Sequence, residues 1–211
     1  MMRVVAGAWR GRRLVAPPGG QTRPTADRVR QALFDMLLHA PWGGRAAIEG
    51  ACVLDAFAGT GALGLEALSR GAAHATFMEN DRAALSALRA NVAACGVADR
   101  TRVIAGDALA PPRATAACGL VFLDPPYGAG LALRAASTLA AAGWVAPDAL
   151  VVAETARTEP CPAAFTKLAE RAHGRARLTV WRWEVGADPS PRPPPARGGE
   201  LFIFPSPCGR G

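Results

Sequence analysis

The sequence contains a single lysine, Lys167, and a single tyrosine, Tyr127, and its cysteines form no recognisable set of metal ligands. The five cysteines are Cys52, Cys95, Cys118, Cys161 and Cys208. They are far apart, with no Cys-x-x-Cys pair and no pair of histidines near any of them. This spacing argues against structural zinc and favours free thiols in a reducing compartment. We therefore expect no metal site.

Long apolar runs are absent as well, although 50% of the residues are hydrophobic. No run approaches the ~18 apolar residues that cross a bilayer, and the first residues lack the apolar core of a secretory signal peptide. A length of 211 residues suits one domain with appendages. We expect a cytoplasmic protein that acts as a monomer and has no membrane partner.

Positive charge is concentrated at the start of the chain. The formal net charge is +7, and residues 1–30 hold seven arginines but only one acidic residue, Asp27. Such a one-sided patch is typical of proteins that bind a phosphate-rich partner such as nucleic acid. The alternative is compositional, because arginine is the default surface cation in a chain with almost no lysine.

The basic region, residues 1–40, predicts a small extension made of a hairpin and a helix. Residues 2–6 and 12–16 resemble two short strands around a basic, aromatic tip. A helix is predicted from about residue 26 to 38, with Thr25 as its N-cap. The expected apolar face of this helix carries Val29, Leu33, Met36 and Leu37. Arg28 and Arg30 should lie largely off that face.

Residues 50–185 alternate between strand and helix patterns, which predicts an α/β fold with a doubly wound, Rossmann-like sheet. The expected strands are residues 52–57, 74–79, 101–106, 120–123 and 149–154, and the expected helices are 62–70, 81–94 and 130–142. Two further strands, 165–172 and 176–185, predict a terminal antiparallel hairpin joined at His173 and Gly174. Residues 186–211 are rich in proline, glycine and arginine, so we expect a mostly disordered tail.

A glycine-rich turn follows the first strand of this domain. Gly59, Gly61 and Gly64 form a Gly-x-Gly-x-x-Gly motif, and Glu79 lies 20 residues after Gly59. Glycine lets the backbone approach a ligand closely, and the helix that follows offers free N–H groups to it. The motif predicts a nucleotide-like cofactor, and it occurs both in dinucleotide dehydrogenases and in methyltransferases that use S-adenosyl-L-methionine (AdoMet).

Two acidic residues favour the methyltransferase. Asp55 ends the first strand, before the glycines, where it could accept the α-ammonium group of AdoMet. Asp124 opens the sequence Asp124-Pro125-Pro126-Tyr127, which ends a later apolar run and has no role in hydride transfer. Acidic residues also follow the second and third strands, at Glu79 and Asp107. Each acid alone could merely cap a helix, but four in order after four strands predict one cofactor site.

The predicted site has separate places for the parts of AdoMet. Asp55 and the turn from Gly59 to Gly61 would hold the methionine end, Glu79 the ribose hydroxyls and Asp107 the adenine amino group. The full set of expected cofactor residues is Asp55, Phe57, Gly59, Thr60, Gly61, Glu79, Asp107 and Ala108.

The Asp-Pro-Pro-Tyr sequence suits an exocyclic amine on a planar ring, whose lone pair is delocalised into the ring. The Asp124 side chain and the Pro125 carbonyl would accept its two N–H groups and direct the lone pair toward the methyl group. Pro125 and Pro126 stiffen this backbone, and Tyr127 would stack on a flipped base. Catalysis would rest on alignment and polarisation, without a metal. The alternative, a turn or a ligand for a proline-binding module, does not explain the apolar strand before it.

Four stretches together resemble one family, the bacterial 16S ribosomal RNA guanine-N2 methyltransferases of the RsmD type. They are residues 3–14 (RVVAGAWRGRRL), 23–34 (RPTADRVRQALF), 54–72 (LDAFAGTGALGLEALSRGA) and 122–127 (FLDPPY). The first two are the more specific, since the last two also occur in other amino-methyltransferases. Two features depart from the family pattern: the hairpin turn at His173 is less aromatic than expected, and the tail is additional.

The resemblance implies a class I methyltransferase fold and AdoMet as methyl donor. The implied substrate is one guanine of 16S rRNA, methylated at N2 within the small ribosomal subunit or its assembly intermediate. The N-terminal extension would help grip the RNA. The matching candidates for RNA contact are Arg10, Arg12, Arg13, Arg23, Thr25, Arg28 and Arg30.

Three other functions share part of the pattern. A DNA adenine-N6 methyltransferase would share Asp-Pro-Pro-Tyr and AdoMet but normally needs a target-recognition domain, for which the chain has no room. An NAD-dependent oxidoreductase would leave Asp124 and the basic extension unexplained. A non-catalytic RNA-binding module would not need the four acids.

Overall fold

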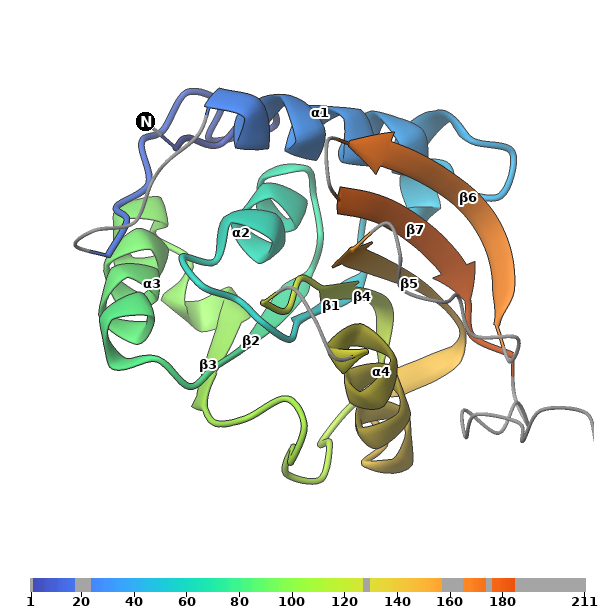
Figure 1. The fold of residues 1–211 in the computed structure, drawn as a ribbon. Helices are drawn as coiled ribbons and strands as arrows, with labels where there is room; N and C mark the ends of the chain where they lie inside the picture. The colour runs from blue at the N-terminus through green and yellow to red at the C-terminus, as the bar shows by residue number, and fades with distance from the viewer. Residues whose placement is uncertain (1, 18–23, 127–129, 157–164, 174–175, 185–211) are drawn as a thin grey trace, which may run out of the picture.

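The computed structural model describes residues 2–17, 24–126, 130–156, 165–173 and 176–184. Within them, seven strands form one sheet in the order β3-β2-β1-β4-β5-β7-β6 (Figure 1). The first five pair in parallel, and β7 runs antiparallel to both β5 and β6. This confirms the predicted doubly wound sheet with a terminal antiparallel hairpin. The predicted tail and Gly174 in the hairpin turn lie outside the described residues.

The elements follow the predicted order closely. The strands are β1 Cys52–Asp55, β2 His74–Glu79, β3 Thr101–Ala105, β4 Cys118–Leu123, β5 Val145–Ala156, β6 Thr166–His173 and β7 Ala176–Arg182. The helices are α1 Pro24–His39, α2 Ala62–Ser69, α3 Arg82–Cys95 and α4 Leu131–Ala141, with two 3₁₀ turns, η1 Arg45–Ala47 and η2 Ala98–Arg100. The largest difference is β5, which extends at both ends beyond the expected 149–154.

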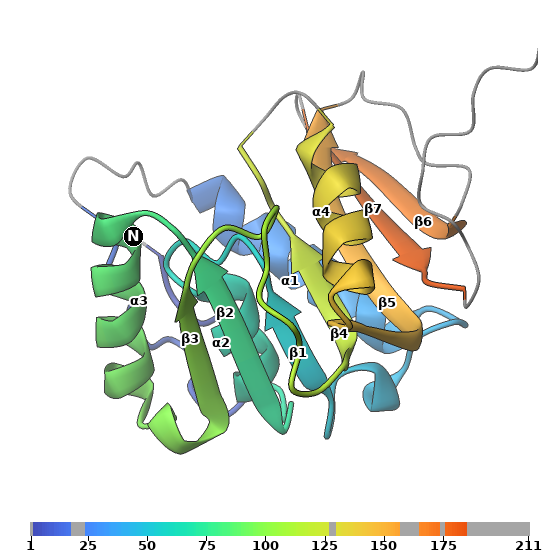
Figure 2. The same ribbon diagram turned by 90° about the horizontal axis from the view of Figure 1, so that it is seen from below.

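Helices cover the two faces of the sheet unequally. One apolar core lies between the sheet and α1, α2 and α3, and includes Phe34, Leu65 and Leu88. The other lies under α4 and includes Leu139 and Trp144. Figure 2 shows α4 in front of the sheet, with α1 and α2 behind it. Successive apolar residues of β1 and β4 enter the two cores in turn, so both faces of these strands are buried, as expected of a parallel sheet.

The glycine-rich turn owes its shape to two different requirements. Gly61 is the N-cap of α2 and has a left-handed φ of 79°, which residues other than glycine rarely adopt. Gly64 lies inside α2, where a Cβ atom would come within 2.3 Å of Cε1 of Phe77 on β2. The first glycine therefore lets the chain turn, and the second lets the helix pack against the sheet.

Replacing Gly64 with alanine should destabilise the protein by about 1–3 kcal/mol, because the added methyl group overpacks the contact with Phe77. Chemical denaturation would measure the change. Gly119→Ala on β4 is the matched control, since a Cβ there meets nothing within 4 Å. A second change, Phe77→Leu, should recover part of the loss in the Gly64→Ala protein. Equal stability of Gly64→Ala and wild type would contradict this account of the motif.

The N-terminal extension is less regular than a hairpin of two strands. Its only bridge among the described residues pairs Arg3 with Arg13. Around it, the N–H of Val4 donates to the carbonyl oxygen of Arg12 at 2.9 Å, and the N–H of Leu14 donates to that of Met2 at 3.0 Å. The N–H groups of Val5 and Ala6 instead donate to the Glu66 carboxylate on α2, at 2.7 and 2.9 Å. The two predicted segments therefore pair with each other, and tertiary hydrogen bonds to Glu66 dock the extension on the domain.

The structure corrects two predictions about α1. The helix begins at Pro24, so Thr25 is its second residue and not its N-cap. Proline suits the first turn because the N–H that it lacks has no partner there. Arg30 was expected off the apolar face but is only 5% exposed. It lies one turn before Leu33 and Phe34, on the same buried stripe.

Arg30 is held by a buried cluster of charges. Its Nη2 donates to Asp27 at 2.8 Å, and its Nε lies 3.5 Å from the carboxylate of Glu66, which is fully buried. Arg70 also pairs with Glu66, at 2.8 Å. These contacts join α1, α2 and the extension. Arg30 therefore supports the fold, and we withdraw it as a candidate for RNA contact.

None of the helices within the described ranges is long and apolar enough to cross a membrane.

Candidate functional site

Acidic residues follow four strands that are neighbours in the sheet. Asp55 ends β1, Glu79 ends β2, Asp107 follows β3 and Asp124 follows β4. These strands are adjacent and parallel, in the order β3-β2-β1-β4. Their carboxyl ends therefore meet at one edge of the sheet, where doubly wound folds bind ligands. The structure brings all four predicted acids to that edge.

Asp55 is the most deeply buried acid of this edge, at 1% exposure. One carboxylate oxygen accepts a hydrogen bond from the N–H of Gly64 at 3.0 Å, near the start of α2. Burial raises the pKa of Asp55 to about 7, against the opposing effect of that hydrogen bond, and the charge of Glu79 adds to the rise. A buried carboxylate with a raised pKa gains from a nearby cation, so this position fits an ammonium group.

Glu79 connects the end of β2 to the glycine-rich turn. Its Oε2 accepts the N–H of Gly59 at 2.7 Å, and its Oε1 accepts the N–H groups of Asn80 and Asp81, both at 2.8 Å. A carboxylate offers about four acceptor positions, and three are used here. One position is left for a hydroxyl group.

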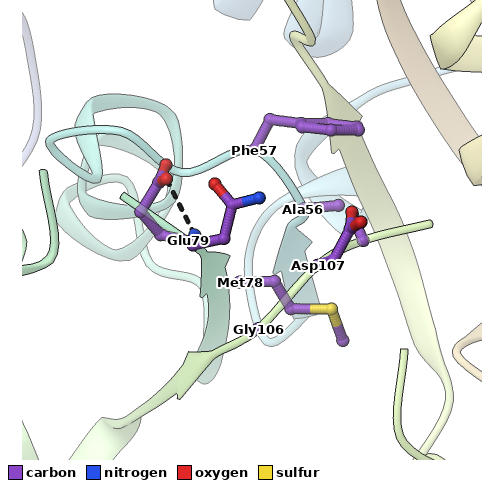
Figure 3. A pocket seen from close by; sticks show the side chains of 8 residues that line it. Ala56, Phe57, Met78, Glu79, Gly106 and Asp107 are labelled. Carbon is purple, nitrogen blue, oxygen red and sulfur yellow. Dashed lines mark hydrogen bonds between the residues drawn. The ribbon is translucent and has the colours of Figure 1, made fainter. Parts of the chain in front are cut away.

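A small hollow opens beside Glu79 (Figure 3). It is lined by Ala56, Phe57, Met78, Glu79, Asn80, Gly106, Asp107 and Ala108. Its empty space is about 170 Å³, part of which is open to solvent. The apolar side chains of Phe57 and Met78 and the carboxylates of Glu79 and Asp107 suit a planar ring carrying polar groups. The Asp107 carboxylate also accepts a hydrogen bond from the N–H of Leu109 at 2.8 Å, so this residue caps the turn that follows β3.

Asp124 directly follows β4 at the same edge of the sheet. Its side chain is exposed at the surface, whereas Pro125 is buried and Pro126 is exposed. Desolvation by the surrounding protein raises the pKa of Asp124, and the carboxylates of Glu154 and Asp55 raise it further. Exposure of Asp124 to water reduces the size of this shift but not its upward direction. Tyr127 lies outside the described residues.

Glu154 is a third carboxylate at this point of the edge, which the sequence analysis missed. Leu123 on β4 is in register with Ala153 on β5, so Asp124 and Glu154 follow as neighbours. The signal was present, because Glu154 comes directly after the apolar run from Leu150 to Ala153, as the other acids follow their strands. The expected strand 149–154 ends at Glu154 just as the expected strand 74–79 ends at Glu79, so the same rule applied to the fifth strand finds it.

The arginines of the extension differ in availability. Arg10, Arg12, Arg13 and Arg28 are exposed, and Arg23 lies outside the described residues, as does the Thr25 side chain. Arg12 also donates from Nη1 to the carbonyl oxygen of Ala94 at the end of α3. Arg100, which the sequence analysis did not single out, lies over the ring of Trp9 at 5.5 Å. The exposed arginines thus belong to a segment that is fastened to the domain.

A family model described as "Conserved hypothetical protein 95" matches residues 2–182. The chain belongs to this family. The match covers the extension, the cofactor edge and the terminal hairpin together, so the basic segment is an integral part of the family's shared structure.

Relatives of the chain are named methyltransferases. It is 41% identical over 155 residues, 73% of this chain and 74% of the relative, to ribosomal RNA small subunit methyltransferase D of Escherichia coli. The protein of the same name from Haemophilus influenzae is 36% identical over 179 residues, 82% of this chain and 89% of its own. A solved structure, described as the putative methyltransferase yhhF from Escherichia coli, has a TM-score of 0.73 and 38% identity. It covers 87% of this chain and 98% of its own.

Proposed function

We propose that this protein transfers a methyl group from AdoMet to the exocyclic N2 of a guanine in 16S rRNA. The observation that carries the proposal is the position of Asp124-Pro125-Pro126, at the carboxyl end of β4 and beside the buried Asp55. The relatives named ribosomal RNA small subunit methyltransferase D support the choice of RNA as substrate.

The residues of the edge fit the cofactor. Asp55 would hold the α-ammonium group, Glu79 the ribose and Asp107 the adenine, with Phe57 and Ala108 beside the ring. The turn at Gly59, Thr60 and Gly61 would lie against the methionine end of the cofactor. AdoMet supplies a methyl group that is already activated on a sulfonium.

The protein's own contribution is to position and polarise the amine. The Asp124 carboxylate and the Pro125 carbonyl would accept the two N–H groups of the guanine amine and align its lone pair with the methyl carbon. As the new N–C bond forms, one amine proton must leave. A carboxyl group with a raised pKa is suited to receive it. Tyr127 would stack on the base.

The experiment that tests this function uses methyl-labelled AdoMet with four substrates in parallel: unmethylated 30S subunits, naked 16S rRNA, duplex DNA and buffer. Nucleosides from the digested product would be identified by mass spectrometry. We expect N2-methylguanosine from a ribosomal substrate and none with Asp124→Ala. Methyladenine in DNA would overturn the substrate, and failure to bind AdoMet would overturn the function.

We infer that residues 1–40 act as an RNA-contact extension, with Arg10, Arg12, Arg13, Arg23 and Arg28 as its cations. Reversing two exposed charges, Arg10→Glu with Arg13→Glu, should weaken RNA binding about 10- to 100-fold at low salt. The slope of log affinity against log salt should fall by about two, because phosphate contacts release counterions. Filter binding at several salt concentrations would measure both. Arg134→Glu on α4, also exposed, is the control, and an equal loss there would contradict a local interface.

A further inference from the structure

One side chain holds the basic extension and the cofactor turn at the same time. Asn91 on α3 is fully buried, and its amide makes three hydrogen bonds to backbone groups. Its Oδ1 accepts the N–H of Val15 at 2.7 Å. Its Nδ2 donates to the carbonyl oxygens of Val15 and Thr60, both at 3.0 Å. Val15 belongs to the extension, and Thr60 lies between the two glycines of the turn.

A second contact joins the same two segments. The hydroxyl of Thr60 donates to the sulfur of Met2 at 3.2 Å. Arg12 adds an attachment to α3 itself, through the carbonyl of Ala94, one turn after Asn91. The extension therefore has a fixed position relative to Thr60, even though these segments are far apart in the sequence.

This arrangement differs from ordinary support of a buried polar group. An asparagine that only satisfied itself could bond within its own helix or to one neighbouring loop. Asn91 instead divides its three bonds between Val15, which follows the exposed Arg12 and Arg13, and the carbonyl group of Thr60 in the glycine-rich turn. Any force that orders the Val15 peptide also orders the Thr60 carbonyl, because both are fastened to one amide group.

We propose that Asn91 is a positioning residue that couples RNA binding by the extension to AdoMet binding by the glycine-rich turn. RNA bound to the extension would order the Val15 peptide and, through Asn91, the glycine-rich turn. Less conformational entropy would then be lost when the turn binds AdoMet. By reciprocity, bound AdoMet would strengthen RNA binding by the same factor. The coupling rests on the proposed function, since it requires both ligands.

The test measures AdoMet affinity by calorimetry with and without a saturating fragment of 16S rRNA. In the wild type we expect RNA to tighten AdoMet binding about fivefold or more. In Asn91→Ala the factor should fall below about twofold. Thermal unfolding of each variant reports stability separately, and a purely structural role would lower the melting temperature without changing the coupling factor.

A second variant breaks the link from the other side and does not touch the core. Val15→Pro removes the N–H that Asn91 accepts, at a residue whose side chain is 55% exposed. Val15→Ala keeps that N–H and is the matched control, expected to couple like the wild type. If Val15 and Asn91 act through the same hydrogen bond, Val15→Pro should lose as much coupling as Asn91→Ala. Combining the two substitutions should then cause no further loss. Should Asn91→Ala fail to fold, Val15→Pro decides the question.

The outcomes separate the two proposals. No binding of RNA by the wild type would overturn the proposed function. Binding of both ligands with a factor near one in the wild type would leave that function standing and overturn the coupling. A coupling factor in Val15→Pro equal to that of the wild type would also overturn the coupling proposal, because the hydrogen bond from Val15 to Asn91 would then not transmit the effect of RNA.

Discussion

Asp124→Asn is expected to lower the rate of methyl transfer about 10³-fold while leaving AdoMet affinity within a few-fold of wild type. Asparagine keeps the shape of the side chain but replaces an acceptor oxygen with an NH₂ group that opposes the amine of the base. The interaction that is lost counts most in the transition state, so kcat should fall rather than KM rise. Single-turnover kinetics with labelled AdoMet and calorimetry for the cofactor would separate the two effects.

The control for Asp124 is Asp107→Asn, after β3 at the same edge of the sheet. Asp107 is proposed to bind adenine, so its replacement should weaken AdoMet binding and leave kcat largely unchanged at saturation. A loss of kcat in both variants would point to general damage of the edge. Retention of kcat in Asp124→Asn would contradict the role of this carboxylate.

Glu154 allows a finer test of the same site. Its charge contributes to the raised pKa of Asp124, so the acidic limb of the pH–rate profile should lie above the ordinary range of an aspartate. Glu154→Gln removes that charge and should move the limb to lower pH. Rates measured at saturating substrate across the acidic range would show the displacement, and an unmoved limb would mean that Glu154 does not act on the titrating group.

The strands and the edge that carries the acids could be predicted from the sequence because several strands end in their own local signal. Asp55, Glu79 and Asp124 all follow short apolar runs, and parallel strands place such residues at one edge. The same rule applies to Glu154, which is the last residue of the expected fifth strand, 149–154.

Contacts between distant segments were beyond the reach of the sequence. The extension pairs with itself as expected, but the sequence did not indicate that the N–H groups of Val5 and Ala6 donate to Glu66, about sixty residues away. Arg30 was misplaced because its charge was weighed above its spacing from Phe34 and Leu37, which puts it on the buried stripe. Asn91 carried a weak signal, a polar residue on the buried face with Leu88 and Val92, but nothing in the sequence named its partners.

Asp55→Asn is expected to stabilise the protein above pH 7 and to remove most of its affinity for AdoMet. The unfolded chain loses the proton of this residue near pH 4, whereas burial raises the pKa in the folded protein to about 7. Between these values the folded state keeps a proton that the unfolded state has lost. Wild-type stability therefore falls as the pH rises from about 4 to 7, and the full penalty is present above that range.

Asparagine carries no charge at any of these pH values and can still accept the N–H of Gly64 through its oxygen. One pKa unit corresponds to about 1.4 kcal/mol, so the variant should exceed wild type by about 2–4 kcal/mol at pH 8 and by little near pH 4. AdoMet affinity should fall about 30-fold or more, because the ammonium group loses its buried partner charge. Denaturant unfolding at several pH values and calorimetry at pH 8 measure the two effects.

Asp99→Asn is the control, because it removes an exposed carboxylate from η2. This 3₁₀ turn precedes β3 and so lies at the opposite end of the strand from the cofactor site. It should change neither the pH dependence of stability nor the affinity. A gain in stability without a loss of AdoMet binding would show that Asp55 is a strained core residue and not the cofactor's partner. Higher stability together with weaker AdoMet binding, seen in Asp55→Asn and not in the control, would mean that a destabilising buried charge is kept at β1 because it binds the ligand.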